Sequence, residues 1–196
     1  MLGASPAGAV ASKAAQLRAL LLTERPLVLP GVFSGISALA AQAAGAKALY
    51  ISGAGVINSA AGLPDVGLLS MAEVAQQLRY IAGVVEAPTL ADADTGFGEG
   101  LALQRTVEEF ERAGVAGVHI EDQQMPKKCG HLDGKRLVTR AEFVQRIRAA
   151  VRERLHGTTA SHLSGGMDST GVALVARDCL EAAGRPPLHT LSLVYE

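Results

Sequence analysis

The sequence has few aromatic residues, only two cysteines and no excess of charge of either sign. Tryptophan is absent from the 196 residues, and aromatic side chains make up 4% of them. Proteins that bind single-stranded nucleic acid usually stack bases on aromatic side chains, so this composition argues against that function. Eighteen basic and nineteen acidic side chains leave a formal net charge of -1. Such a balance does not create the field that collects nucleic acid or anionic lipid.

The scarcity of cysteine and the absence of long apolar runs exclude two further classes of protein. Cys129 and Cys179 form neither a Cys-x-x-Cys pair nor a disulfide framework, which predicts free thiols in a reducing compartment. No apolar run approaches the ~20 residues that span a bilayer. Residues 1–15 lack the basic and apolar regions of a signal peptide. We therefore expect a cytoplasmic protein that binds neither membrane nor nucleic acid.

The order of the apolar segments predicts alternating strands and helices. Hydrophobic residues make up 48% of the chain. Strands are expected at residues 27–33, 48–52, 88–92 and 115–120, and helices at 11–23, at 35–44, before Gly114 and after two capping boxes (Ser70 with Glu73, Thr139 with Glu142). Residues 53–55 are expected to form a loop. This alternation implies parallel strands with right-handed crossovers. Because the first strand is not followed by a dinucleotide glycine fingerprint, a (β/α) barrel is favoured over a Rossmann sheet.

Carboxylates gather where three successive strands are expected to end. Asp92 and Asp94 flank one alanine at the end of the third strand, Glu121 follows the fourth, and Asp65 lies in the loop after the second. Neighbouring carboxylates repel each other unless a cation neutralises them, and Mg²⁺ suits a site with few protein ligands. The alternative is that these acids cap helices or lie in solvent. Their position at successive strand ends favours a metal site.

A thiol lies among positive side chains shortly after the fourth strand. The segment KKCGH at residues 127–131 surrounds Cys129 with two lysines and an imidazole. Positive neighbours stabilise a thiolate, so Cys129 is a candidate for exchanging a proton with a carbanion or enolate. The lysines are candidates for attracting a polycarboxylate substrate. The alternative is a surface loop with an incidental cysteine. Cys179 lies on an apolar helical stretch and is expected to pack.

Together these segments resemble the isocitrate lyase/phosphoenolpyruvate mutase superfamily, and most closely its 2-methylisocitrate lyase branch. The matching pieces are YISGAG at 50–55, LPD at 63–65, DADTGFG at 92–98, HIEDQ at 119–123 and KKCGH at 127–131. The resemblance covers residues 10–155. It implies an α/β fold made of the first four units of a (β/α)8 barrel, with the site at the carboxyl ends of the strands.

The resemblance implies a metal site and a reaction. Asp92 and Asp94 would hold Mg²⁺, with Mn²⁺ as an alternative, and Asp65 and Glu121 would lie outside the direct ligands. The reaction would be the retro-aldol cleavage of 2-methylisocitrate to pyruvate and succinate, a step of propionate catabolism. Isocitrate cleavage and oxaloacetate decarboxylation stay open as alternatives. The expected partners are a small dicarboxylate or tricarboxylate substrate and, in a homo-oligomer, further copies of the chain.

The resemblance also implies how substrate would be bound and protonated. Ser52, Gly53 and Ala54 would bind a substrate carboxylate through a hydroxyl and backbone N–H groups. Ala54 stands where this branch usually has glycine, which leaves the backbone donor intact. Cys129 would protonate the departing carbanion, and Gly130 would add a backbone contact to the substrate.

The last part of the chain resembles a different family. Residues 161–170, SHLSGGMDST, are similar to the SGGxDS pyrophosphate loop of asparagine synthetases. This likeness implies that phosphate of ATP would be bound by Ser164, Gly165, Gly166, Asp168 and Ser169. A glycine-rich turn before a helix is the alternative reading of the same residues.

We therefore expect a chain in two parts. Residues 1–156 would form the N-terminal half of a lyase-type barrel, and residues 157–196 an ATP-pyrophosphatase-like fragment of strand, loop, helix and strand. The resemblance implies that the second half of the barrel is lacking. Either the appended strand, helix and strand pair with the fourth strand and cover part of its open edge, or the chain needs a partner there. An active lyase, an ATP-binding fragment and a non-catalytic fusion remnant all stay open.

Overall fold

Four parallel strands form the central sheet of the structure, a computed structural model that describes residues 11–152, 160–163 and 189–192. These strands are β1 (Gly31–Val32), β2 (Leu49–Ile51), β3 (Thr89–Asp92) and β4 (Gly117–His119). They lie in the order β1-β2-β3-β4, and each neighbouring pair is parallel. The sheet is therefore built from consecutive βα units, as the alternation of apolar segments predicts.

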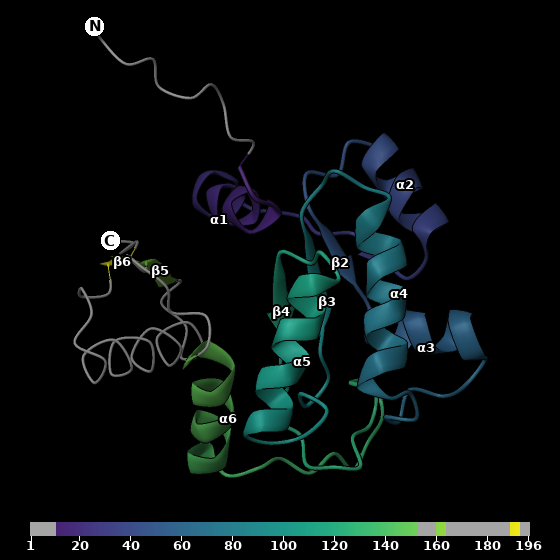
Figure 1. The fold of residues 1–196 in the computed structure, drawn as a ribbon, viewed down its shortest axis with the longest axis vertical. Helices are drawn as coiled ribbons and strands as arrows, with labels where there is room; N and C mark the ends of the chain where they lie inside the picture. The colour runs from purple at the N-terminus through teal and green to yellow at the C-terminus, as the bar shows by residue number, and fades with distance from the viewer. Residues whose placement is uncertain (1–10, 153–159, 164–188, 193–196) are drawn as a thin grey trace, which may run out of the picture.

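Helices join these strands and pack against one another beside the sheet (Figure 1). Their bounds are α1 (Lys13–Thr23), α2 (Gly35–Ala43), α3 (Gly53–Ala61), α4 (Met71–Gly83), α5 (Leu101–Arg112) and α6 (Arg140–Arg152). α2 packs against α4, α4 against α5, and α5 against α6, so the helices follow the order of the strands. Parallel strands with helices outside them in this order form a partial (β/α)8 barrel, which confirms the predicted fold class.

The main core lies between the sheet and its helices. Leu49 and Ile51 of β2, Leu78 and Ile81 of α4, and Phe110 of α5 are at most 1% exposed. These side chains belong to one continuous cluster of buried apolar residues. Because β2 is paired with β1 and β3 on its two edges and buries Leu49 and Ile51, its carboxyl end is fixed where the next helix begins.

Helix α1 lies outside the βα repeat, at the amino ends of the strands. Lys13 donates from Nζ to the carbonyl oxygens of Ala82 and Val85, both at 2.6 Å, which ties α1 to the end of α4. Leu17 of α1 is buried. Its Cδ2 atom would lie 3.6 Å from a Cβ added to Gly117 at the start of β4. α1 therefore packs at the end of the sheet opposite the carboxyl ends of the strands.

The two predicted capping boxes are confirmed. Ser70 N donates to Glu73 Oε2 at 2.8 Å before α4, and Thr139 N donates to Glu142 Oε2 at 2.7 Å before α6. In each pair the hydroxyl oxygen in turn accepts the backbone N–H of the glutamate. Both helices therefore begin where the sequence predicts.

Two local predictions are wrong, and one of the two alternatives for the appended segment is not realised. The strand expected at residues 27–33 is confined to β1, because Pro26 and Pro30 have no N–H to give to a ladder. The loop expected at 53–55 is the first turn of α3, which Ser52 caps. The appended strand β5 (Ala160–Leu163) pairs in parallel with β6 (His189–Ser192) and not with β4.

The residues of the predicted phosphate loop, Ser164, Gly165, Gly166, Asp168 and Ser169, lie outside the described residues, as does Cys179. The prediction of a phosphate site there stays a prediction. Within the described ranges, no helix combines the length and the apolar character needed to cross a membrane.

Leu103 and Leu101 provide a matched test of the packing of α5. Leu103 is 0% exposed, in a cluster that joins α5 to α6, whereas Leu101 is 81% exposed. Leu103→Ala is expected to lower the free energy of unfolding by about 2–5 kcal/mol, because it leaves a cavity. Leu101→Ala is expected to change it by less than about 0.5 kcal/mol. Denaturant titration measures both values, and equal effects would contradict the packing described for α5.

Candidate active site

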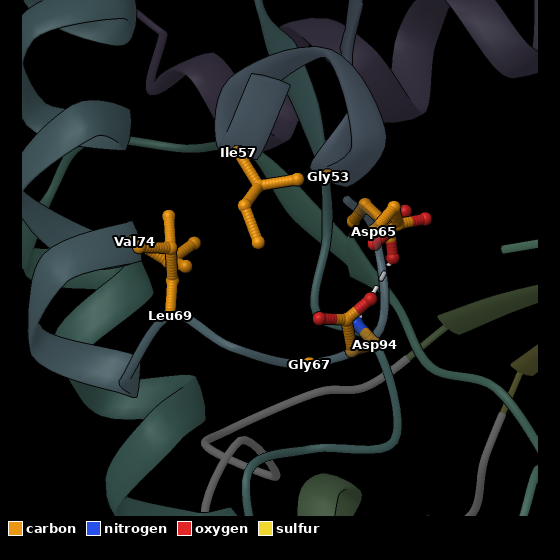
Figure 2. A pocket seen from close by; sticks show the side chains of 8 residues that line it. Gly53, Ile57, Asp65, Gly67, Leu69, Val74 and Asp94 are labelled. Carbon is orange, nitrogen blue, oxygen red and sulfur yellow. Dashed lines mark hydrogen bonds between the residues drawn. The ribbon is translucent and has the colours of Figure 1, made fainter. Parts of the chain in front are cut away.

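A pocket lies at the carboxyl ends of the central strands (Figure 2). The residues that line it are Gly53, Ile57, Asp65, Gly67, Leu69, Val74, Asp92 and Asp94. Figure 2 shows Asp65 and Asp94 on one side of the pocket and the side chains of Leu69 and Val74 on the other. The pocket therefore has an acidic wall and an apolar wall, and its volume of about 10 Å³ is that of a single water or ion.

The turn after β3 places Asp92 and Asp94 in this pocket. Asp94 N donates to Asp92 Oδ1 at 2.9 Å, and Asp94 O accepts from Glu121 N at 2.7 Å. Asp94 has a φ of 48°, in the left-handed region that aspartate tolerates better than most residues. The sequence predicted that both acids would lie at the end of the third strand. Instead, β3 ends at Asp92, and the turn directs Asp94 into the same pocket.

The first turn of α3 lies against Asp92. A Cβ added to Gly53 would lie 2.9 Å from Asp92 Oδ2, so only glycine allows the carboxylate to lie this close. Ser52 Oγ accepts from Gly55 N at 3.2 Å and caps the helix. The N–H groups of Gly53 and Ala54 have no partner within the helix, which makes this turn suitable for binding an anion. The residues predicted to bind a substrate carboxylate are thus neighbours of the acidic pair.

A buried ammonium lies between two of the acids. Lys127 Nζ is 2.5 Å from Asp65 Oδ1 and also contacts Asp94 Oδ1. The exposed fraction of the side chain is 3% for Lys127, 11% for Asp65 and 16% for Asp94. Buried charges are stable only when paired, so the three groups depend on one another. The sequence suggested substrate attraction for Lys127 and gave no sign of this pairing.

Burial and the ammonium act on the pKa of Asp94 in opposite directions. Burial raises the pKa of Asp94 to about 6, although contact with Lys127 lowers it. Burial would also lower the pKa of Lys127, but its contacts with Asp65 and Asp94 outweigh this and raise that pKa above the usual range. Lys127 therefore remains charged at neutral pH, and Asp94 is ionised above about pH 6.

Tyr50 lies beside the acidic wall and keeps its proton. Burial, followed by the charge of Asp92, raises the pKa of Tyr50 above its usual range. Its hydroxyl lies 3.3 Å from Nδ1 of His119, a residue of β4. The phenol is thus available as a hydrogen-bond donor at neutral pH. Tyr50 belongs to the YISGAG segment, from which no role for its side chain was predicted.

Glu121 lies behind Asp94 and does not line the pocket. Its N–H donates to Asp94 O at 2.7 Å, and its carboxylate accepts from Gln123 Nε2 at 2.6 Å. The sequence predicted that Glu121 would lie near the acidic pair, and the backbone contact places it next to Asp94. Its role as an outer partner of a metal ion stays a prediction.

Arg146 of α6 binds the backbone that follows β4, next to the acidic pair. Its guanidinium donates to Glu99 Oε1 at 2.6 and 3.1 Å, to Glu121 O at 2.6 Å and to Gln123 O at 3.2 Å. The Arg146 side chain is 3% exposed. Arg146 was not among the residues predicted from the sequence to form the site. The sequence could have pointed to it, because Arg146 lies three positions after Phe143 and so shares the apolar face of the predicted helix.

Cys129 lies in a loop whose start reaches the pocket. The loop at residues 124–136 is closed at its base, where Gln124 N donates to Arg136 O at 2.8 Å. Lys127 carries the first part of the loop to the acids. Cys129 is half-buried and Gly130 is exposed, and neither lines the pocket. Their predicted contact with substrate stays a prediction.

Asp92 and Asp94 fit a magnesium site with few protein ligands. Both line the pocket. Nowhere in the described ranges do three or more His, Cys, Asp or Glu side chains form a group that could hold a metal ion. Mg²⁺ is usually bound by one or two carboxylates together with waters and substrate oxygens, which suits a pair of acids. Asp65 also lines the pocket, and its carboxylate forms an ion pair with Lys127.

Comparison with known proteins identifies the family. Residues 17–162 match the family model described as phosphoenolpyruvate phosphomutase. The chain belongs to this family. Over 138 residues it is 52% identical to a protein of Corynebacterium glutamicum named "Probable 2-methylisocitrate lyase 2", covering 70% of this chain and 45% of the relative. The chain thus spans about half the length of the curated relatives it matches.

Solved structures of the superfamily share this fold. A crystal structure of 2,3-dimethylmalate lyase, described as a PEP mutase/isocitrate lyase superfamily member, is 34% identical, with a TM-score of 0.70 over 96% of this chain and 65% of that one. Phosphonopyruvate hydrolase in complex with oxalate and Mg²⁺ is 26% identical, with a TM-score of 0.62 over 93% of this chain and 64% of that one. The resemblance to the isocitrate lyase/phosphoenolpyruvate mutase superfamily is confirmed.

The raised pKa of Asp94 predicts how stability depends on pH. A raised pKa in the folded state stabilises the fold below the ordinary value of 3.8, and this contribution is lost as pH rises through about 6. Between pH 4 and pH 8, the metal-free protein should therefore lose about 2–3 kcal/mol relative to Asp94→Asn. Urea titrations in EDTA measure both free energies of unfolding. A difference that stays constant with pH would contradict the raised pKa.

Proposed function

We propose that this chain carries the metal- and carboxylate-binding face of a Mg²⁺-dependent carbon–carbon lyase that cleaves 2-methylisocitrate to pyruvate and succinate. The main support is that Asp92 and Asp94 meet the first turn of α3 in one pocket at the carboxyl ends of the strands. The relatives that match include 2-methylisocitrate lyases. The chain's span of about half their length makes its activity a question for experiment.

The charges in the pocket support a divalent cation. Asp65, Asp92 and Asp94 carry three negative charges when ionised, and Lys127 supplies one positive charge. Two negative charges therefore remain, which is the amount that one Mg²⁺ neutralises. Asp92 and Asp94 would hold the ion, which when bound polarises substrate oxygens and stabilises negative charge that develops on them.

The first turn of α3 supports binding of a carboxylate beside that ion. Gly53 packs against Asp92, and the N–H groups of Gly53 and Ala54 in the same turn have no partner within the helix, so one substrate group can be held by backbone donors. Because these donors belong to a capped helix, they are oriented before substrate arrives. Preorganised donors of this kind need no rearrangement during the reaction.

The thiol of Cys129 supplies the last proton in the proposed reaction. A base first takes the proton of the substrate hydroxyl, and the bond between C2 and C3 breaks to give the keto group of pyruvate. The electron pair of that bond remains on the carbon that becomes part of succinate. Cys129 then gives its proton to this carbon and becomes a thiolate.

Release of pyruvate tests the proposed function directly. The purified chain should release pyruvate from 2-methylisocitrate with Mg²⁺, and EDTA should abolish the release. Cys129→Ser should lower kcat by about a hundredfold or more, since the general acid is lost, while Cys179→Ser should retain the activity. Isocitrate and oxaloacetate serve as alternative substrates in the same assay. Absence of any turnover by the folded protein would favour the non-catalytic remnant.

Gly53→Ala tests whether the position of Asp92 matters for the metal ion. The added methyl group would lie 2.9 Å from Asp92 Oδ2 and must displace the carboxylate. We expect the affinity for Mg²⁺ to fall by about tenfold or more. Gly83→Ala is the control, because a Cβ there meets nothing within 4 Å. Isothermal titration calorimetry measures both, and equal affinities would argue against Asp92 as a ligand.

A further inference from the structure

The side-chain amide of Gln123 makes three hydrogen bonds at the base of the cysteine loop. Its Oε1 accepts from Lys128 N at 3.0 Å, while Nε2 donates to Lys128 O at 2.8 Å and to Glu121 Oε2 at 2.6 Å. Gln123 is 5% exposed. The amide therefore binds both backbone groups of Lys128, as a neighbouring strand would, and joins them to the carboxylate of Glu121.

The backbone of Gln123 is itself fixed from two sides. It forms an antiparallel bridge with Leu137, beside which Val138 N donates to Asp122 O at 2.8 Å. From α6, Arg146 Nη1 donates to Gln123 O at 3.2 Å. Because the backbone cannot move freely, the side-chain amide is a rigid point of attachment for the loop.

We propose that Gln123 is a positioning residue, which holds the segment carrying Lys127 and Cys129 in place against Glu121. The proposal rests on the proposed lyase function, because it assigns Gln123 a task in proton transfer from Cys129. Lys128, whose backbone the amide holds, is the residue between Lys127 and Cys129. The clamp thus sets the direction in which both side chains leave the loop, although Gln123 contacts neither of them.

The chemistry of the clamp requires an amide and not a carboxylate. Nε2 makes two of the three hydrogen bonds as a donor, to Lys128 O and to Glu121 Oε2. In Gln123→Glu, an oxygen would face both of these acceptors and repel them, with little change of shape. Gln123→Met removes all three bonds without adding charge. Gln124→Glu makes the same chemical change at the next, exposed position and is the control.

The reactivity of Cys129 reports on the clamp without any requirement for catalysis. With Cys179→Ser as background, Cys129 is the only thiol in the chain. Alkylation by iodoacetamide is measured at a pH at which a cysteine peptide is fully ionised. Both Gln123 variants should react about tenfold faster than the parent, since the loop opens more often, and Gln124→Glu should match the parent. Unchanged rates in folded Gln123 variants would overturn the proposal.

Steady-state kinetics separate positioning from a merely structural role. Both Gln123 variants should lose about tenfold to a hundredfold in kcat, because a misplaced proton donor slows the chemical step. KM for 2-methylisocitrate should change by less than about twofold, since the first turn of α3 is untouched. A lower melting temperature with unchanged kcat and unchanged alkylation would show that Gln123 serves stability alone. If the parent shows no turnover, the proposed function fails and alkylation still decides on the clamp.

Hydrogen exchange on the unmodified protein tests the clamp even if the variants do not fold. The N–H of Lys128 belongs to an exposed residue, and its partner is Gln123 Oε1. We expect this amide to exchange at least about tenfold more slowly than an unprotected amide of the same sequence. Exchange at the unprotected rate would overturn the proposal.

Discussion

The contact of the Lys127 ammonium with Asp65 and Asp94 is the interaction on which the arrangement of the pocket depends. It joins the loop before α4, the turn after β3 and the cysteine loop after β4, three segments that are distant in sequence. Each partner is nearly buried, so loss of one would leave an unpaired charge in the interior. The geometry of the acidic wall and the position of the cysteine loop are therefore set by the same contact.

Arg146 is a second buried cation near the carboxyl ends of the strands, with different partners from those of Lys127. Lys127 binds carboxylate side chains inside the pocket, whereas Arg146 binds backbone carbonyls of Glu121 and Gln123 and the carboxylate of Glu99. One buried cation thus fixes the groups that face a ligand, and the other fixes the chain that carries them. A chain with almost balanced charge uses both of these positive side chains for internal structure.

Much of the fold could be predicted from the sequence, because it depends on local patterns. Capping boxes at Ser70 and Thr139 and apolar segments of regular spacing are visible without any knowledge of distant contacts. The helical start at Gly53 was missed, because glycine-rich segments read as loops and the cap of Ser52 depends on one hydroxyl. Lys127, Gln123 and Arg146 were not assigned their contacts, because buried polar pairing depends on which segments meet in space.

The closed base of the cysteine loop has a consequence for how this part of the chain can change. Residues 131–134 at its tip are exposed, while the base is held by Gln123, Leu137 and Arg136 regardless of the identity of those tip residues. Leu132 N donates to Cys129 O at 2.9 Å, so the tip is tied to the thiol-bearing residue through its backbone. Substitutions of the exposed side chains of Leu132 and Asp133 therefore need not disturb the thiol or the acids. This segment is the natural place for randomised libraries, in which new contacts are selected on an unchanged scaffold.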